Sequence, residues 1–295
     1  MKNKIEKIFI QKEKLDLDEK MYRDCVKRYT IDVLKEDTGR KGDITTNVLF
    51  KRAKKKRAII KARNSGILAG IEEVKWFLEQ NKLKVKLMKK DGVRVKKGDR
   101  ILTITGNVKD ILKTERVALN VLSRMSGIAT ETLKLKITSK GKVLICPTRK
   151  TLWSLMDKKA CVVGGGGTHR LGLWNFILIK DNHLELLKND VDKALNPLKR
   201  SNSIVEIEVE NRDQAVDAAK HNPDIIMFDN FKAKKIRKVI SRIDKKYPDN
   251  DIIFEASGGI NKYNVKKYSN SGVDVISLGY LTHSVKSLDF SLSFL

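Results

Sequence analysis

Proline, cysteine and aromatic residues are scarce in this sequence of 295 residues. The chain has four prolines and three cysteines, and aromatic residues make up 6% of it. The cysteines, Cys25, Cys146 and Cys161, are odd in number and form no CxxC pair. This spacing argues against a disulfide scaffold and against a zinc site, and it is typical of a protein from a reducing compartment. We therefore expect a cytoplasmic protein.

Long apolar runs are also missing. No run approaches the roughly 18 residues that a membrane-spanning helix needs. The first 20 residues are charged throughout and lack the apolar core of a secretory signal. We therefore expect neither a membrane span nor export.

Acidic residues are outnumbered by basic ones, 36 against 62, which gives a formal net charge of +26. Such an excess favours anionic partners, which include nucleic acid, an acidic membrane surface and polyanionic small substrates. Lysines spread along solvated faces explain much of it equally well. The densest basic run, residues 51–57, has no aromatic residue between its cations. Because it lacks the stacking platform of a single-strand binder, we interpret it as a solvated turn.

The order of apolar runs predicts two parts. A helix is expected over 5–36, and residues 1 to about 110 form a small α/β unit with strands at 58–62, 84–88, 92–95 and 100–105. After a helix over 114–138, apolar runs alternate with helical stretches, which predicts parallel pairing and fits a barrel better than a doubly wound sheet. Seven such runs cover residues 143–145, 161–163, 176–179, 204–209, 225–228, 252–254 and 273–278.

Polar residues and glycines follow most of these runs. In an α/β barrel the carboxyl ends of the strands face one mouth, so residues far apart in the sequence converge there. Four cations at such positions suit carboxylate or phosphate ligands: Arg149, Lys150, Arg170 and Lys180. Two loops rich in glycine, Ser257-Gly258-Gly259 and the loop at Gly279, predict a phosphate site, although an ordinary turn is the alternative.

Two carboxylates, Glu208 and Asp229, end neighbouring strands of this pattern. Such a pair can hold Mg²⁺ or stabilise a developing positive charge, or it can simply pair with nearby cations. Glu206 and Glu210 alternate with Glu208, share its expected face and leave the same alternatives open.

Ten motifs, taken in chain order, resemble the quinolinate phosphoribosyltransferase family. The resemblance runs from residue 36 to the end of the chain. The motifs are GDITT (42–46), RVALN (116–120), SGIAT (126–130), TRKT (148–151), HR (169–170), LIKDNH (178–183), EIEVE (206–210), DN (229–230), EASGGI (255–260) and LTHS (281–284).

The resemblance implies an α/β fold in three segments. These are an N-terminal open-faced α/β sandwich over residues 1–125, an incomplete TIM-like barrel over 126–275, and a C-terminal segment, 276–295, that returns to the sandwich. It also implies a homodimer in which the sandwich of one subunit covers the barrel mouth of the other. In such a dimer, Arg116 acts in the site of the other subunit. An oligomer larger than a dimer stays open as an alternative.

The implied reaction joins quinolinate and phosphoribosyl pyrophosphate, with Mg²⁺ as cofactor, to give nicotinate mononucleotide, pyrophosphate and CO₂ in NAD biosynthesis. The residues implied as catalytic are Lys180, Glu208 and Asp229. Those implied to bind quinolinate are Arg116, Arg149, His169, Arg170 and Lys180. Those implied for phosphoribosyl pyrophosphate are Lys150, Glu208, Asp229, Ser257, Gly258, Gly259 and Gly279, with Glu208 and Asp229 also holding Mg²⁺, directly or through water.

One segment departs from the family pattern. Leu152-Trp153-Ser154-Leu155-Met156 stands where the family has Pro-Gly-Leu-Arg after TRKT. Two alternatives therefore stay open. One is a sibling phosphoribosyltransferase that uses another acceptor, such as nicotinate. The other is the related molybdenum-transport-associated protein, which the motif KDNH (180–183) disfavours. A basic nucleic-acid-binding protein on an inactive scaffold is supported only by the charge and by residues 51–57. The intact catalytic positions disfavour it.

Overall fold

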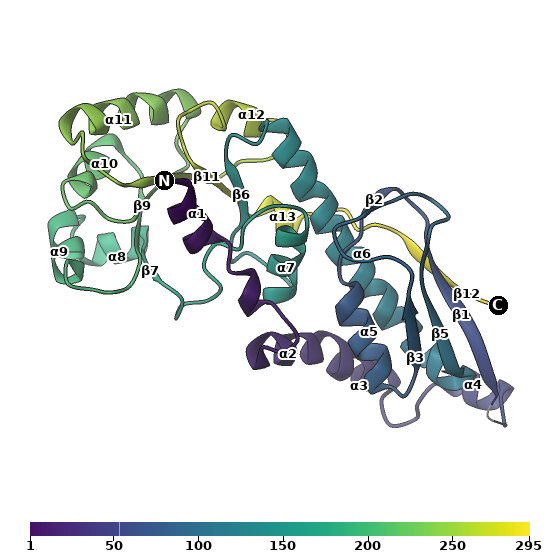
Figure 1. Ribbon diagram of the computed structural model, residues 1–295. Helices are drawn as coiled ribbons and strands as arrows, with labels where there is room; N and C mark the ends of the chain where they lie inside the picture. The colour runs from purple at the N-terminus through teal and green to yellow at the C-terminus, as the bar shows by residue number, and fades with distance from the viewer. Residues whose placement is uncertain (53) are drawn as a thin grey trace. The chain divides into compact units, whose positions relative to one another are not determined.

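The computed structural model describes residues 1–52 and 54–295. The chain forms two compact units, which we describe separately (Figure 1). The parallel-sheet unit comprises residues 1–11, 134–151 and 166–284, and the antiparallel-sheet unit comprises residues 12–133, 152–165 and 285–295. In the described part of the chain, no helix combines the length and apolarity needed to cross a membrane.

The parallel-sheet unit is built on six parallel strands in the order β6-β11-β10-β9-β8-β7. Most of the strand residues are buried, which explains their near-continuous apolar sequences. Connections through helices between parallel strands make this an α/β fold, as predicted. The strands are β6 (Leu144–Pro147), β7 (Ile177–Ile179), β8 (Val205–Val209), β9 (Ile225–Asp229), β10 (Ile253–Ser257) and β11 (Val275–Leu278).

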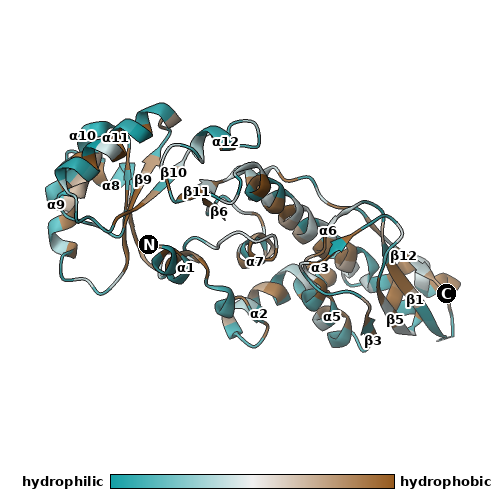
Figure 2. Ribbon diagram, turned by 45° about the horizontal axis from the view of Figure 1, so that its top comes forward, coloured by the Kyte–Doolittle hydropathy of each residue, from teal (hydrophilic) through white to brown (hydrophobic). Residues whose placement is uncertain are grey.

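The long helix after β9 buries one apolar stripe. In α11 (Ala233–Lys246), Ile236, Val239, Ile240 and Ile243 recur at helical spacing and are buried, while most lysines are exposed. Figure 2 shows the resulting hydrophilic outer face of α11. The other helices are α8 (Asp181–Leu186), α9 (Val191–Leu195), a 3₁₀ turn (Asn196–Leu198), α10 (Arg212–Ala219), α12 (Val265–Tyr268) and α13 (Tyr280–His283).

The N-terminal helix α1 (Lys2–Phe9) covers the end of the sheet at which the strands begin. Its Ile8 and Phe9 pack in one cluster with Ile225, Ile253 and Val275, which are the first residues of β9, β10 and β11. The hydroxyl of Thr168 donates to the carbonyl of Phe9 at 2.8 Å. This packing leaves the carboxyl ends of the strands as the accessible end of the sheet.

The antiparallel-sheet unit contains four strands in the order β12-β1-β5-β3. The last strand of the chain, β12, pairs with β1 in antiparallel register. The strands are β1 (Lys55–Ala62), β3 (Lys84–Leu87), β5 (Arg100–Asn107) and β12 (Phe290–Phe294), with a separate pair of β2 (Gly66–Ile67) and β4 (Arg94–Val95).

Eight helical segments of the described residues belong wholly or mainly to the same unit. They are a 3₁₀ turn (Lys12–Lys14), α2 (Lys20–Lys27), a π-helical turn (Arg28–Asp32) that leads into α3 (Val33–Thr38), α4 (Ile44–Leu49), α5 (Ile71–Gln80), α7 (Leu155–Val163) and α6 (Val108–Thr138), whose last five residues lie in the parallel-sheet unit.

Three expectations about local structure are wrong. Residues 161–163 end helix α7 and form no strand, because a short apolar run looks the same in a buried helix and in a buried strand. The parallel sheet therefore has six strands where seven runs were expected. The helix expected over 5–36 is interrupted after Phe9, and the side chain of Asp16 accepts the backbone N–H of Asp18 in the break.

The basic run 51–57 is the third case. Its last three residues, 55–57, begin β1 with exposed side chains, so they form part of a strand and not a turn. Ala53, in the same run, lies outside the described residues.

Candidate active site

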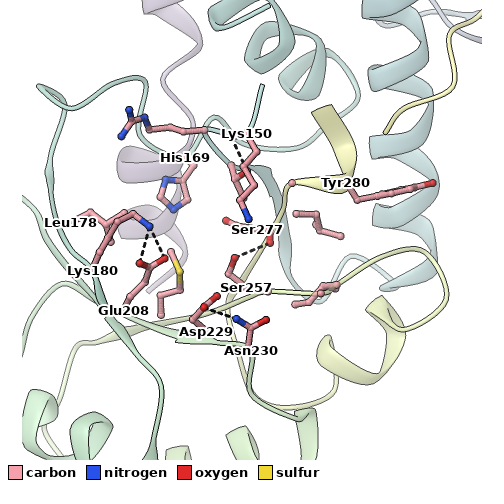
Figure 3. Close-up of a pocket in the computed structure, with 18 of the residues that line it drawn as sticks. Lys150, His169, Leu178, Lys180, Glu208, Asp229, Asn230, Ser257, Ser277 and Tyr280 are labelled. Carbon is pink, nitrogen blue, oxygen red and sulfur yellow. Dashed lines mark hydrogen bonds and ion pairs between the residues drawn. The ribbon is translucent and has the colours of Figure 1, made fainter. Parts of the chain in front are cut away.

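A cavity of about 610 Å³ lies at the carboxyl ends of the strands in the parallel-sheet unit (Figure 3). Every strand of the sheet contributes a lining residue from its end or from the loop that follows it. The cavity brings together all the site residues predicted from the sequence except Arg116. These are Arg149, Lys150, His169, Arg170, Lys180, Glu208, Asp229, Ser257, Gly258, Gly259 and Gly279.

Lys180 and Glu208 form an ion pair inside this cavity, as Figure 3 shows. The ammonium Nζ of Lys180 lies 3.0 Å from Oε1 and 2.8 Å from Oε2 of Glu208. Lys180 follows β7 and Glu208 lies in the neighbouring strand β8, so the sheet itself brings them together. Burial raises the pKa of Glu208, although the bond from Lys180 opposes the shift.

A second carboxylate, Asp229, ends β9, the next strand of the sheet. Its Oδ2 accepts a hydrogen bond of 2.7 Å from the amide Nδ2 of Asn230. The negative charge of Asp229 adds to the upward shift of the pKa of Glu208, after the larger effect of burial. The cavity therefore holds two acidic groups close enough to interact.

Cations surround these carboxylates. Arg149 and Lys150 follow β6 and are exposed, while Arg170 is buried. Burial lowers the pKa of Arg170, and the charge of Arg149 lowers it further. The hydroxyl of Thr282 donates to the carbonyl of Lys150 at 2.6 Å and holds that segment in place. Several positive charges in one cavity suit a ligand with several negative charges.

The loop after β10 contains two consecutive glycines, which have no side chains. Gly258 and Gly259 have φ of +85° and +60°, in the left-handed region that favours glycine. A Cβ at Gly258 would overlap the Asn230 side chain and lie 2.7 Å from the backbone nitrogen of Asn230, whereas one at Gly259 would meet open space. Asn230 N–H also donates to the carbonyl of Ser257 at 3.0 Å. A glycine-rich turn of this kind lets backbone N–H groups approach a phosphate closely.

His169 lies at the floor of the cavity above two buried glutamates. Its Nε2 lies 3.2 Å from Oε1 of Glu255 and 3.5 Å from Oε1 of Glu206, and both carboxylates are inaccessible to solvent. Burial alone would lower the pKa of His169, but the charges of Glu255 and Glu206 outweigh it and raise this pKa to about 9. Burial also raises the pKa of Glu206, to about 7.

The described residues contain one group of three metal-ligating side chains whose ligand atoms lie within 4.8 Å of one another, namely His169, Glu206 and Glu255. Glu208 and Asp229 form no such closed group. They do offer the carboxylate oxygens that Mg²⁺ prefers, and Mg²⁺ in such sites keeps several waters and is completed by substrate phosphates. The two residues therefore fit a magnesium ion that is shared with a substrate.

Three predicted features lie elsewhere. Arg116 is exposed on α6 in the antiparallel-sheet unit and does not line the cavity. The unusual segment 152–156 also belongs to that unit, and none of its residues lines the cavity. Glu210 is exposed, whereas Glu206 is fully buried, so the two do not share the environment of Glu208.

Sequence reasoning gave no site role to several polar lining residues, among them Ser277 and Tyr280. Ser277 is the one polar residue of β11, which was a usable signal, and its carbonyl accepts from the hydroxyl of Ser257 at 3.4 Å. Tyr280 begins α13 and carried no signal. The meeting of Glu255 with His169 was missed as well, because no sequence rule pairs residues of a strand with a loop 86 positions away.

Comparison with known proteins gives consistent matches along the chain. Residues 43–126 match the model of the quinolinate phosphoribosyl transferase N-terminal domain, and residues 128–293 match that of the C-terminal domain. The nicotinate-nucleotide pyrophosphorylase (carboxylating) of Mycobacterium leprae is 34% identical over 279 residues, which cover 92% of this chain and 96% of that protein.

Solved structures agree with these matches. The nicotinate-nucleotide pyrophosphorylase from Francisella tularensis has a TM-score of 0.82 at 34% identity and covers 92% of this chain and 96% of its own. That from Ehrlichia chaffeensis has a TM-score of 0.84 at 31% identity and covers 93% and 98%.

Proposed function

We propose a function for this protein on one premise: the chain belongs to the quinolinate phosphoribosyl transferase family. It transfers the phosphoribosyl group of phosphoribosyl pyrophosphate to quinolinate, and it releases pyrophosphate and CO₂ to give nicotinate mononucleotide for NAD biosynthesis. The proposal rests on one observation: cations, two carboxylates and a glycine-rich loop line the same cavity.

Quinolinate carries two carboxylates, and the cavity offers matching positive groups. Arg149, Arg170 and Lys180 line it together with His169, whose pKa the charges of the buried glutamates raise to about 9 against the effect of burial. Arginine forks bind carboxylates with two parallel hydrogen bonds, and lysine supplies a compact charge. Glu208 pairs with Lys180, so quinolinate competes with that carboxylate for the ammonium group.

Phosphoribosyl pyrophosphate binds along the other side of the cavity. Its 5′-phosphate accepts hydrogen bonds from the backbone N–H groups of the Ser257–Gly259 loop and of Gly279, and Lys150 contacts its charged groups. Glu208 and Asp229 hold Mg²⁺, which supplies positive charge against the pyrophosphate when it is bound.

The chemistry then needs positioning and charge, and no covalent nucleophile. As the bond from ribose to pyrophosphate breaks, positive charge develops on the sugar, and Glu208 and Asp229 stabilise it most at that stage. The pyridine nitrogen attacks the ribose carbon. The resulting pyridinium withdraws electrons, so the neighbouring carboxylate leaves as CO₂. The electron pair of the broken bond stays on the ring carbon beside the positively charged nitrogen, and that carbon takes up a proton from water to give nicotinate mononucleotide. The cavity holds both substrates in line for these steps.

Arg116 completes the quinolinate site from a second subunit of a homodimer. Its exposure on α6 and its place in the RVALN motif support this role. The protein acts in the cytoplasm, which the three free cysteines support.

An acceptor panel tests the proposal. Purified protein is incubated with phosphoribosyl pyrophosphate, Mg²⁺ and either quinolinate or nicotinate, and nicotinate mononucleotide is followed by mass spectrometry. We expect product from quinolinate only, and only when all three components are present. Product from nicotinate alone would favour the sibling transferase that the unusual segment 152–156 suggests.

A further inference from the structure

Residues 166–176 form an irregular loop between α7 and β7, and this loop carries two residues assigned to quinolinate, His169 and Arg170. We propose that Gln11 and Asn175 are positioning residues for the acceptor: their paired side-chain amides fix the loop and, with it, the place of His169 and Arg170 in the cavity. This inference rests on the proposed function and adds two residues that act through others. All the contacts that carry it lie within the parallel-sheet unit.

The two amides form a reciprocal pair. Nε2 of Gln11 donates to Oδ1 of Asn175 at 2.8 Å, and Nδ2 of Asn175 donates to Oε1 of Gln11 at 2.9 Å. Two backbone groups determine the orientation of the amides. Nε2 of Gln11 also donates to the carbonyl of Ile8 at 3.1 Å, and Oδ1 of Asn175 also accepts from the N–H of Leu171 at 2.9 Å. Turning either amide over would place two donors or two acceptors face to face.

The loop is anchored on both sides of the two site residues. Leu171, whose N–H the amide pair binds, follows them directly in the sequence. Thr168 precedes them, and its N–H and its hydroxyl both donate to the carbonyl of Phe9, at 2.5 and 2.8 Å. The site residues are thus enclosed between two anchors, and each anchor leads to the segment 8–11 at the end of α1.

Both anchors adjoin buried apolar residues. Phe9 and Phe176, which follows Asn175, are buried in the same apolar cluster. Their rings lie 5.5 and 5.6 Å from the ring of His169, measured between centroids. Gln11 is itself buried, and a buried amide is costly unless its polar atoms have partners. The N-terminal segment therefore holds the loop by its backbone and His169 by its ring.

The backbone between the anchors depends on such support. The φ of His169 is +50°, an uncommon value for a residue with a side chain, and such conformations persist where neighbouring contacts determine them. The N–H of Arg170 donates to Nδ1 of His169 at 2.7 Å and thereby fixes the orientation of the ring. A binding group that moves by about 1 Å can cost an enzyme about 100-fold in rate. Loss of an anchor should therefore weaken the site that these two residues form for the acceptor.

The variant Asn175→Ala tests the proposal, because it removes the oxygen that accepts from Leu171 and the amide that pairs with Gln11. We expect KM for quinolinate to rise about tenfold, on the scale of one hydrogen bond lost at a buried group. KM for phosphoribosyl pyrophosphate should not change, because the residues assigned to it follow other strands. Asn202→Ala, at an exposed position of the same unit, is the control and should change neither constant. An unchanged KM for quinolinate in Asn175→Ala, or equal rises in both KM values, would overturn the proposal.

Two further variants separate the hydrogen bonds from the bulk of the side chains. Asn175→Asp keeps an oxygen for the N–H of Leu171, so its KM for quinolinate should be lower than that of Asn175→Ala. Gln11→Met keeps the length of the side chain and loses its donors and its acceptor, so it should raise KM for quinolinate. A KM as high in Asn175→Asp as in Asn175→Ala, or a wild-type KM in Gln11→Met, would contradict the roles of these atoms.

Hydrogen exchange of the loop gives a readout that does not depend on activity. In the wild-type protein the N–H of Leu171 should be protected, and in Asn175→Ala and Gln11→Met it should exchange about tenfold faster or more. Asn202→Ala should leave its exchange unchanged. Wild-type protection of Leu171 in both variants would overturn the proposal. If the wild-type protein does not convert quinolinate but the two variants exchange faster, the proposed function fails and the anchoring of the loop stands.

Discussion

At the scale of single residues, Lys180 and Glu208 form an ion pair in the structure and have separate roles in the proposed reaction. In the structure, Nζ of Lys180 lies 2.8 Å from Oε2 of Glu208. In the proposed reaction each has a different partner, because Lys180 binds the acceptor and Glu208 faces the developing charge on the ribose. Their mutual pairing opposes the upward shift that burial causes in the pKa of Glu208.

Glu208→Gln should lower kcat by about 100-fold or more, because it removes a negative charge that is most valuable in the transition state. Steady-state kinetics with saturating substrates measure the loss, and circular dichroism should show an unchanged fold. Activity within a factor of two of wild type in the folded variant would remove Glu208 from the catalytic role.

Gly258→Ala should weaken binding of phosphoribosyl pyrophosphate and lower the free energy of unfolding by about 1–3 kcal/mol. The added Cβ would overlap Asn230 and would sit on a backbone with φ of +85°. Gly259→Ala is the matched control, because its Cβ would meet open space and only the backbone conformation is penalised. Equal losses in both variants would show that contact with Asn230 has no role.

The site residues were predictable to the extent that they follow strand ends in recognisable motifs. Lys180, Glu208, Asp229 and the Ser257–Gly259 loop all reach the cavity as the sequence predicted. Glu255 stood in a recognised motif, yet its meeting with His169 could not be foreseen, because it depends on how far each side chain extends across the sheet interior.

At the scale of elements, the carboxyl group of Asp91 lies at the start of helix α5 and has a raised pKa. Asp91 accepts the backbone N–H of Ile71 at 3.1 Å, and burial together with the charge of Glu73 raises its pKa to about 7. A carboxyl whose pKa is higher in the folded state than in the unfolded state stabilises the protein when protonated. That contribution is complete below about pH 4 and is lost as the pH rises through about 7.

Asp91→Asn should therefore raise the melting temperature relative to wild type at pH 8, and this difference should shrink as the pH falls to 4. The amide keeps an acceptor for Ile71 and removes the buried charge. Thermal unfolding at both pH values measures the difference, and Glu79→Gln, at an exposed position near the end of α5, is the control. A lower melting temperature at pH 8 would contradict the assignment.

Elements with several alternating or helical repeats were predictable, and short ones were not. The strands β8, β9 and β10 lie where the sequence placed them within a few residues, and helix α6 ends where the sequence predicted. The segment 161–163 was misassigned because three apolar residues carry no period, and its helix depends on packing within the antiparallel-sheet unit. Asp157, in the same helix, accepts hydrogen bonds of 2.8 and 2.7 Å from Nε and Nη2 of Arg124. This contact joins residues that lie 33 positions apart in the sequence.

At the scale of the whole molecule, the proposed homodimer makes a complementation prediction. If Arg116 acts in the site of the partner subunit, Arg116→Ala and Lys180→Ala are each inactive alone, but their heterodimer has one intact site. Co-expression with two different affinity tags should recover about a quarter of wild-type activity in a statistical mixture of dimers. Purified heterodimer without activity would contradict action in trans.

The most direct test of the central claim follows the fate of one carbon atom. Quinolinate labelled with ¹³C in the carboxylate next to the ring nitrogen is incubated with the protein, Mg²⁺ and phosphoribosyl pyrophosphate. Labelled CO₂ and nicotinate mononucleotide are then measured together. We predict one labelled CO₂ for each nucleotide formed, and none without phosphoribosyl pyrophosphate. Nucleotide formed without labelled CO₂, or labelled CO₂ released without phosphoribosyl pyrophosphate, would contradict a transfer that is coupled to decarboxylation in this cavity.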